Sequence, residues 1–183
     1  MAVVEQVDGE HGVRRRDFIY VATGAFAGVG AAAAGWTLVN QMNPSADVLA
    51  LASIEVDLTP VSAGQAIKVS WRGKPVFIRN LTPAEQTAAN KVPLSELRDP
   101  QTLAERTKEG HANWLITLGV CTHLGCVPLG AGEGEVKGDF GGYFCPCHGS
   151  SYDTAARIRK GPAPKNLEVP DYAFKSPTLV QIG

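Results

Sequence analysis

Cysteine and histidine gather in two short segments of this 183-residue chain. The first reads C-T-H-L-G-C from Cys121 to Cys126, and the second begins C-P-C-H at Cys145. Together they hold all four cysteines and two of the four histidines. Thiolate favours soft centres such as zinc or iron–sulfur, and imidazole suits zinc or iron. Facing each other, the segments would offer two thiolates and two imidazoles to one metal centre, with two cysteines left over.

A structural zinc site is the alternative of a different class. Zinc ligands usually follow spacings such as C-x₂₋₄-C with H-x₃₋₅-H, which keep the thiolates together and the histidines together. Here each segment mixes the two residue types, and zinc would leave Cys126 and Cys147 without a role. The spacing therefore favours another centre.

The two segments resemble the cluster-binding loops of Rieske [2Fe–2S] proteins, where two histidines replace two cysteines on one iron. The resemblance covers about residues 53–183, with loops at 121–126 and 145–152. It implies one [2Fe–2S] cluster as the cofactor. It also implies that Cys121 and Cys145 bind one iron. His123 and His148 would bind the other iron.

The same resemblance assigns roles to residues around the four ligands. It implies a disulfide that joins the loops, Cys126 with Cys147. The run C-P-C-H-G-S-S-Y matches as a whole, so Ser150 and Tyr152 are expected to donate hydrogen bonds to the cluster; otherwise they are ordinary strand residues. In the family, both histidine ligands face the quinol. Shielding of the cluster from water is expected from Leu124 and from a stiff turn: Gly161, Pro162, Ala163 and Pro164.

Ala156 departs from the family pattern, which commonly has glycine at this position. If the position needs a positive φ, alanine costs on the order of 1–2 kcal/mol there.

The N-terminal part predicts a single membrane anchor. Residues 18–39 carry no charge, and 22 residues of helix extend about 33 Å, enough for a bilayer core of about 30 Å. We therefore expect a transmembrane helix over 18–40 and a hinge or tether over 41–52. A cleaved signal is the alternative, because Ala31–Ala34 offers small residues for cleavage. Retention is favoured because relatives in respiratory complexes keep this segment.

An arginine pair precedes the anchor, in residues 1–17. Arg15, Arg16 and Phe18 resemble the twin-arginine export signal, which suits a cluster protein that must cross the membrane already folded. Positive charge alone would also hold this end in the cytoplasm. Both interpretations place the N-terminus in the cytoplasm and the head in the periplasm, and a disulfide fits an oxidising compartment.

The head is expected to be mostly β, a Rieske-type antiparallel β-sandwich with a small helical insertion. Apolar and polar residues alternate over 54–58 and 67–71, as in half-buried strands. A turn at Arg72-Gly-Lys74 leads into Pro75–Arg79 and closes a hairpin. A capping box at Thr82–Glu85 starts one helix, and a second is expected between Asp99 and about Gly110. The remaining predicted strands are Trp114–Val120, Leu167–Val169 and Leu179–Ile182.

Two neutral imidazoles leave a cluster less negative than four thiolates do, so its potential is higher and quinol can reduce it. Imidazole can also lose a proton on oxidation, which couples electron and proton uptake. The resemblance therefore points to the branch found in bacterial respiratory cytochrome bc complexes, at the inner membrane. There the subunit takes one electron from quinol at cytochrome b and passes it to a c-type cytochrome, contributing to proton translocation.

Such a chain is one subunit of an oxidoreductase, in a complex expected to be dimeric, and has no complete active site of its own. An exported Rieske subunit of a molybdenum oxidoreductase is the main alternative. Rieske ferredoxins and oxygenase components normally lack the extra cysteines and the anchor. A formal charge of −1 gives no reason to expect nucleic acid as a partner.

Overall fold

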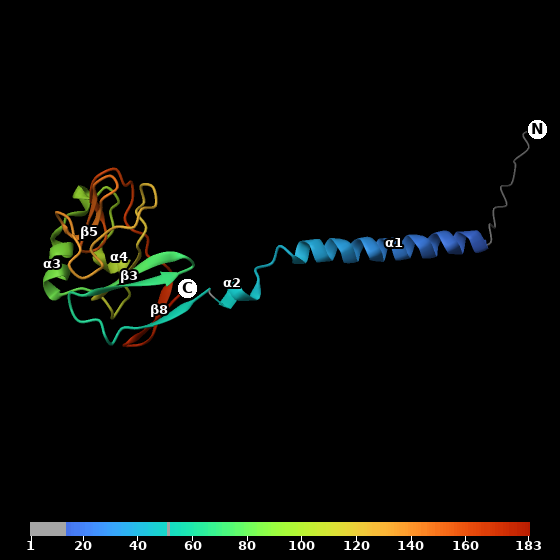
Figure 1. Cartoon of the computed structure of the whole chain (residues 1–183), viewed down its shortest axis with the longest axis horizontal. Coiled ribbons are helices and arrows are strands. Elements are labelled where there is room, and N and C mark those ends of the chain that lie inside the picture. Colours follow the sequence, from blue (N-terminus) through green and yellow to red (C-terminus); the bar gives the residue numbers. More distant parts are fainter. Residues whose placement is uncertain (1–13, 51) are drawn as a thin grey trace, which may run out of the picture. The chain divides into compact units, whose positions relative to one another are not determined.

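The computed structural model describes residues 14–50 and 52–183 (Figure 1). The chain divides into two compact units, with the boundary between Leu49 and Ala50. Of the expected cytoplasmic segment 1–17, residues 1–13 lie outside the described residues.

One long helix, α1 (Arg15–Asn40), makes up most of the first unit. It starts within the arginine run, where Asp17 accepts a hydrogen bond from the Arg14 backbone N–H at 3.1 Å. None of its residues is buried within the described chain, although it carries large apolar side chains such as Phe26 and Trp36. Its 26 residues are long and apolar enough to cross a membrane.

The expected tether contains a second, short helix, α2 (Ala46–Ala50). The head-side end of the tether is fixed to the second unit. The Trp71 indole N–H donates to the carbonyl oxygen of Ala52 at 2.9 Å, and the Arg72 guanidinium donates to the same oxygen at 3.1 Å.

The second unit contains three antiparallel sheets of three strands each, visible as arrows in Figure 1. This confirms the mostly β prediction. The first sheet has the order β1 (Ile54–Asp57), β9 (Leu179–Ile182), β8 (Tyr172–Ser176). The second has the order β2 (Ala66–Trp71), β3 (Lys74–Asn80), β4 (Trp114–Leu118). The third has the order β5 (Gly141–Cys145), β6 (Ser150–Asp153), β7 (Ile158–Lys160).

The predicted hairpin is confirmed. Arg72 and Gly73 have φ values of 50° and 72°, as a two-residue turn of type I′ requires, and they join β2 to β3. The strand predicted over Leu167–Val169 is wrong. That segment belongs to no strand; it forms separate hydrogen bonds, such as that from Leu118 N–H to the Glu168 carbonyl at 2.7 Å, and β8 is the strand that pairs with β9 instead.

The helical insertion comprises α3 (Pro83–Lys91), the 3₁₀ helix η1 (Leu94–Glu96) and α4 (Leu103–Arg106). The capping box before α3 is confirmed, since Thr82 and Glu85 exchange hydrogen bonds of 2.9 and 3.2 Å. The second helix is much shorter than predicted. It starts after Thr102, which forms an equivalent capping box with Glu105.

Two apolar clusters share the sheet β2-β3-β4. Val76 and Ile78 pack on one face, and Phe77 between them packs on the other, so β3 is buried on both sides. We call the sheets β1-β9-β8 and β2-β3-β4 the base. We call the sheet β5-β6-β7, together with residues 121–126 and 161–167, the loop region.

Candidate metal centre

The two cysteine loops project from the ends of strands. The first loop follows β4 and is closed on itself by a 2.8 Å hydrogen bond from Cys121 N–H to the Cys126 carbonyl. The second loop begins at the tip of the hairpin β5–β6, where Cys145 lies opposite Ser150 in the ladder. The sheets therefore present both predicted ligand segments as short turns on rigid strands.

Among the four predicted ligands, the two cysteines are buried and the two histidines are more exposed. Cys121 and Cys145 are free and buried, each 2 % exposed. His123 is half-buried and His148 is exposed, with their rings 4.7 Å apart, edge to face. The thiols thus lie inside the loop region, while the imidazoles reach its surface.

Cys126 and Cys147 form a disulfide between the two loops, with their Cα atoms 6.8 Å apart. The sulfur atoms of this pair lie within 4.8 Å of the Cys145 sulfur. Because the pair is bonded, neither of its members can act as a thiolate ligand. The free thiols are those that the sequence assigned to iron.

Burial raises the pKa of the Cys145 thiol, and the neighbouring Cys121 thiol adds to this effect. Backbone N–H groups of Cys147 and His148 oppose it by donating hydrogen bonds to the sulfur. A buried thiol of this kind becomes a thiolate when a metal cation compensates the charge.

One buried hydroxyl contacts a thiol, and a second belongs to Ser150, the ladder partner of Cys145. The Tyr152 hydroxyl is 3.2 Å from Cys121 Sγ and fully buried; burial raises its pKa, so it stays protonated and can donate. The Ser150 hydroxyl oxygen accepts the Ala163 backbone N–H at 3.2 Å. Among the residues that the structure describes, the Ser150 hydroxyl has no protein acceptor for its own hydrogen, although the residue is 1 % exposed.

The segment Gly161–Pro164 lies directly against the second loop. A Cβ on Gly161, which has φ of 98°, would lie 2.5 Å from the Ser150 Cα, so only glycine allows this approach. Ala163 is fully buried in the cluster that also contains Cys121 and Cys145. Leu124, in contrast, is 71 % exposed next to His123 and covers little of the chain itself.

This donor set fits a [2Fe–2S] cluster of the Rieske type. It combines two free buried thiols with two paired imidazoles, and a buried hydroxyl with an unused hydrogen lies beside them. A zinc site would use the same four side chains, but it would not need hydrogen-bond donors around sulfur.

Comparisons with known proteins agree with this geometry. Residues 81–173 match the family model described as "Rieske [2Fe-2S] domain". Residues 6–45 match the model described as "Ubiquitinol-cytochrome C reductase Fe-S subunit TAT signal". The chain is 57 % identical to the ubiquinol-cytochrome c reductase iron-sulfur subunit of Rhodospirillum rubrum, over 92 % of this chain and 91 % of that protein. It belongs to the family of Rieske iron–sulfur subunits.

Other relatives give the same result. The corresponding subunit of Bradyrhizobium diazoefficiens is 53 % identical over 92 % of this chain and 94 % of its own length. Among solved structures, a chain of a hyperthermophilic respiratory Complex III is similar with a TM-score of 0.53 and 26 % identity, covering 88 % of this chain and 98 % of that one. This Rieske subunit is therefore a component of an oxidoreductase complex of the cytochrome bc₁ type and carries one [2Fe–2S] cluster. Its apolar helix and export signal make it a membrane-anchored protein with an exported head.

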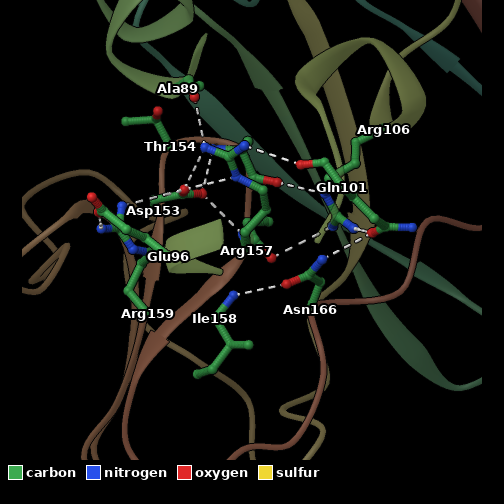
Figure 2. A network of polar contacts seen from close by, with 12 residues as sticks. Ala89, Glu96, Gln101, Arg106, Asp153, Thr154, Arg157, Ile158, Arg159 and Asn166 are labelled. Carbon is green, nitrogen blue, oxygen red and sulfur yellow. Dashed lines mark hydrogen bonds and ion pairs between the residues drawn. The ribbon is translucent and has the colours of Figure 1, made fainter. Parts of the chain in front are cut away.

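A buried polar network supports the turn that follows the second loop in this Rieske subunit (Figure 2). Arg157 is 1 % exposed and forms an ion pair with Asp153 at 2.7 Å. Its guanidinium also donates to the carbonyl oxygens of Gln101 and Ala89, at 3.0 and 2.7 Å. Arg106 donates to the Ala155 carbonyl at 2.7 Å, and burial lowers its pKa to about 10. The helical insertion thus holds the loop region through hydrogen bonds to its backbone.

This network was not predicted, because a run such as Arg157-Ile-Arg-Lys resembles surface charge. The expectation for Ala156 is confirmed. Its φ is 59°, in the left-handed region, and it is fully buried between the two arginine contacts.

Proposed function

We propose that this subunit takes one electron from quinol at a cytochrome b subunit and passes it to a c-type cytochrome. The arrangement of the predicted ligands carries the proposal, because the thiols are buried while the imidazoles reach the surface. A quinol that docks on this face would meet His148 and His123 first. When bound, the [2Fe–2S] cluster supplies one-electron chemistry at a high potential.

In this proposal, Cys121 and Cys145 hold one iron, and His123 and His148 hold the other. The exposed position of His148 lets an imidazole exchange a hydrogen bond and a proton with a bound quinol, so that electron and proton leave together. The disulfide of Cys126 with Cys147 keeps the two loops in register.

Ser150 and Tyr152 are proposed to adjust the potential. A hydrogen bond to sulfur stabilises the extra electron of the reduced state and so raises the potential. The unused hydrogen of Ser150 and the position of the Tyr152 hydroxyl at the Cys121 sulfur support this role. Residues Gly161–Pro164 would exclude water from the same side, as the contact of Gly161 with the second loop suggests.

Leu124 is proposed to contact the partner and so to cover the cluster in the complex. It is 71 % exposed and stands one residue from His123, and Val127 adds a second exposed apolar side chain. Apolar groups that surround a functional polar residue mark an interaction surface. We place this surface against cytochrome b, within a dimeric complex.

The arginines at the start of α1 support the proposed orientation. Arg15 and Arg16 would hold the N-terminus in the cytoplasm, and the head would enter the periplasm of a bacterial inner membrane. Arg15 and Arg16 replaced together by lysine should leave the head in the cytoplasm, as measured by protease protection in spheroplasts. Normal delivery of this variant would contradict the role of the pair.

The main experiment measures potential and quinol oxidation in one variant of the intact complex. Ser150→Ala and Tyr152→Phe should each lower the midpoint potential while iron and acid-labile sulfide remain at two per chain, since each removes a donor. Quinol oxidation should slow together with the potential. A lowered potential with unchanged quinol oxidation would mean that the potential of this cluster does not limit quinol oxidation. An unchanged potential would make both residues ordinary strand residues.

A further inference from the structure

Residues 161–164 cover the second loop without belonging to a strand. Their two prolines supply no N–H group, so other groups must fix the position of this segment. The Ala163 N–H is used for the hydrogen bond to the Ser150 hydroxyl oxygen, at 3.2 Å. The orientation of Ser150 therefore depends on where residues 161–163 are held.

Arg98 holds this segment from outside. Its Nη1 donates to the carbonyl oxygen of Gly161 at 2.7 Å and to that of Ala163 at 2.5 Å. One nitrogen thus joins two carbonyls that are two residues apart, which requires the chain between them to curve toward the guanidinium.

The backbone that carries Arg98 is itself fixed on both sides. Leu97 is buried, and the Asp99 carboxylate and carbonyl oxygens accept hydrogen bonds from Asn166 at 3.0 and 2.9 Å. Asn166 Oδ1 in turn accepts the Ile158 N–H at 2.9 Å, so the chain from 158 to 166 is closed at its ends and Arg98 binds its middle. The guanidinium is preorganised although Arg98 itself is exposed.

We propose that Arg98 is a positioning residue for electron transfer: it fixes Gly161 and Ala163 so that Ser150 presents its hydroxyl hydrogen to the cluster. This inference rests on the donor role of Ser150 in the proposed function. Arg98 acts through Ala163 and Ser150 and touches neither the predicted ligands nor the quinol.

The test compares midpoint potentials of variants in the intact, membrane-derived complex. Arg98→Ala removes both carbonyl contacts together with one positive charge. Arg98→Lys keeps the charge and a donor. Lys160→Ala is the matched control, because it removes a positive charge one residue before Gly161, where Lys160 pairs with Asp139 and contacts no carbonyl of the segment. Ser150→Ala and the double variant Arg98→Ala with Ser150→Ala complete the cycle.

We expect Arg98→Ala to lower the potential in the same direction as Ser150→Ala, by a smaller amount, and by more than Lys160→Ala. Arg98→Lys should restore most of the loss. The double variant should have the potential of Ser150→Ala alone, because Arg98 has nothing left to position. Arg98 is exposed, so its replacement leaves no cavity; if Arg98→Ala nevertheless loses the cluster, Arg98→Gln, which keeps one amide donor, takes its place.

Four results would overturn the proposal. A potential equal to that of Lys160→Ala would mean that only charge matters. A full addition of the two shifts in the double variant would mean that Arg98 acts without Ser150. An unchanged potential in Ser150→Ala would contradict the donor role of Ser150, and the positioning role of Arg98 that depends on it. A shifted potential in Ser150→Ala with an unchanged potential in Arg98→Ala would overturn the role of Arg98 alone.

Discussion

The base and the loop region of this Rieske subunit are stabilised in different ways. In the base, aliphatic side chains such as Ile78, Ile116 and Val180 pack together, and the strands have up to seven residues. The loop region has strands of three to five residues and one disulfide, and it is joined to the helical insertion by the buried side chains of Arg106 and Arg157, which donate hydrogen bonds to backbone carbonyls. The base is stabilised by the burial of apolar side chains, which has no directional requirement. In the loop region, directional polar contacts hold the backbone in position.

This difference matches what each region has to do. Apolar packing tolerates small shifts, because many neighbouring arrangements bury the same area. A hydrogen bond weakens steeply when its length or angle changes. Groups that must keep a fixed distance to a metal centre are therefore better held by arginine contacts to carbonyl oxygens than by aliphatic side chains.

Loss of the buried arginine should have the largest effect. Arg157→Met leaves Asp153 buried without its partner and should destabilise the protein by about 3–5 kcal/mol. Arg159→Met is the comparison variant: Arg159 lies 3.7 Å from the exposed Glu96 and only 4.0 Å from Asp153, both longer than the Arg157 pair, so it should cost less, about 0–1 kcal/mol. Chemical unfolding of the full chain in detergent, followed by cluster absorbance, measures both. Equal costs would contradict the structural role of Arg157.

A cavity in the base should change stability without changing the potential. Ile116 is fully buried, and Ile116→Ala should cost about 2–5 kcal/mol, against about 0.5–1.5 kcal/mol for Ile116→Val. A redox titration of each variant should give the wild-type midpoint. A shifted midpoint would show that the base also positions groups at the metal centre, and the comparison drawn above would fail.

Removal of the disulfide should weaken the loop region selectively. The bond joins residues that are 21 positions apart, and Cys126→Ser with Cys147→Ser should cost roughly 3 kcal/mol by chain entropy. Cluster absorbance should then be lost at a lower denaturant concentration than the far-ultraviolet signal of the sheets. Coincident loss of both signals would mean that the two regions unfold as one unit.

Ala156→Gly should stabilise the loop region by about 1 kcal/mol, because glycine adopts φ of 59° without the Cβ clash. Ala155→Gly is the neighbouring control; Ala155 has no positive φ and is fully buried, so its replacement should destabilise. Thermal unfolding of the two variants should give shifts of opposite sign. Shifts of the same sign would contradict the backbone explanation.

The smallest effect is expected at an ion pair between the base and the connection that precedes β5. The Lys68 ammonium on β2 holds the pKa of Glu135 at about 2, with help from the N–H groups of Gly130 and Gly132. A carboxylate with a lowered pKa stabilises the folded state above its unfolded pKa, and this contribution is lost as the pH falls through the folded value. Because the pair is partly exposed, Glu135→Gln should cost only about 0–1 kcal/mol at neutral pH.

Thermal unfolding of wild type and Glu135→Gln at several pH values measures this cost. The difference should be constant from pH 7 to about 5 and should shrink below about pH 4.5, toward the folded pKa. A difference that grows on acidification would contradict the assigned sign.

The sequence predicted β1, β2, β3, β4 and β9 of the base, because hydrophobic patterns are local signals, and the family resemblance supplied the two ligand loops. It placed one strand wrongly at Leu167–Val169, although the aromatic residues Tyr172 and Phe174, two positions apart, are typical of a strand and lie in β8. The capping box at Thr102–Glu105 would have located α4. Burial of Arg106 and Arg157 could not be predicted, since it depends on carbonyls that only the folded chain brings together.

The pairing of β1 with β9 determines when this head can finish folding. Asp57 lies opposite Leu179, and Ile54 lies opposite Ile182. The first strand of the head can therefore pair only after β9 has been synthesised. About 120 residues separate the partners, which at about 5–20 residues per second means roughly 6–24 s of synthesis with β1 unpaired. The export signal leaves the ribosome long before that. A route that accepts only folded proteins could therefore accept this head only after β9 has been synthesised and has paired with β1.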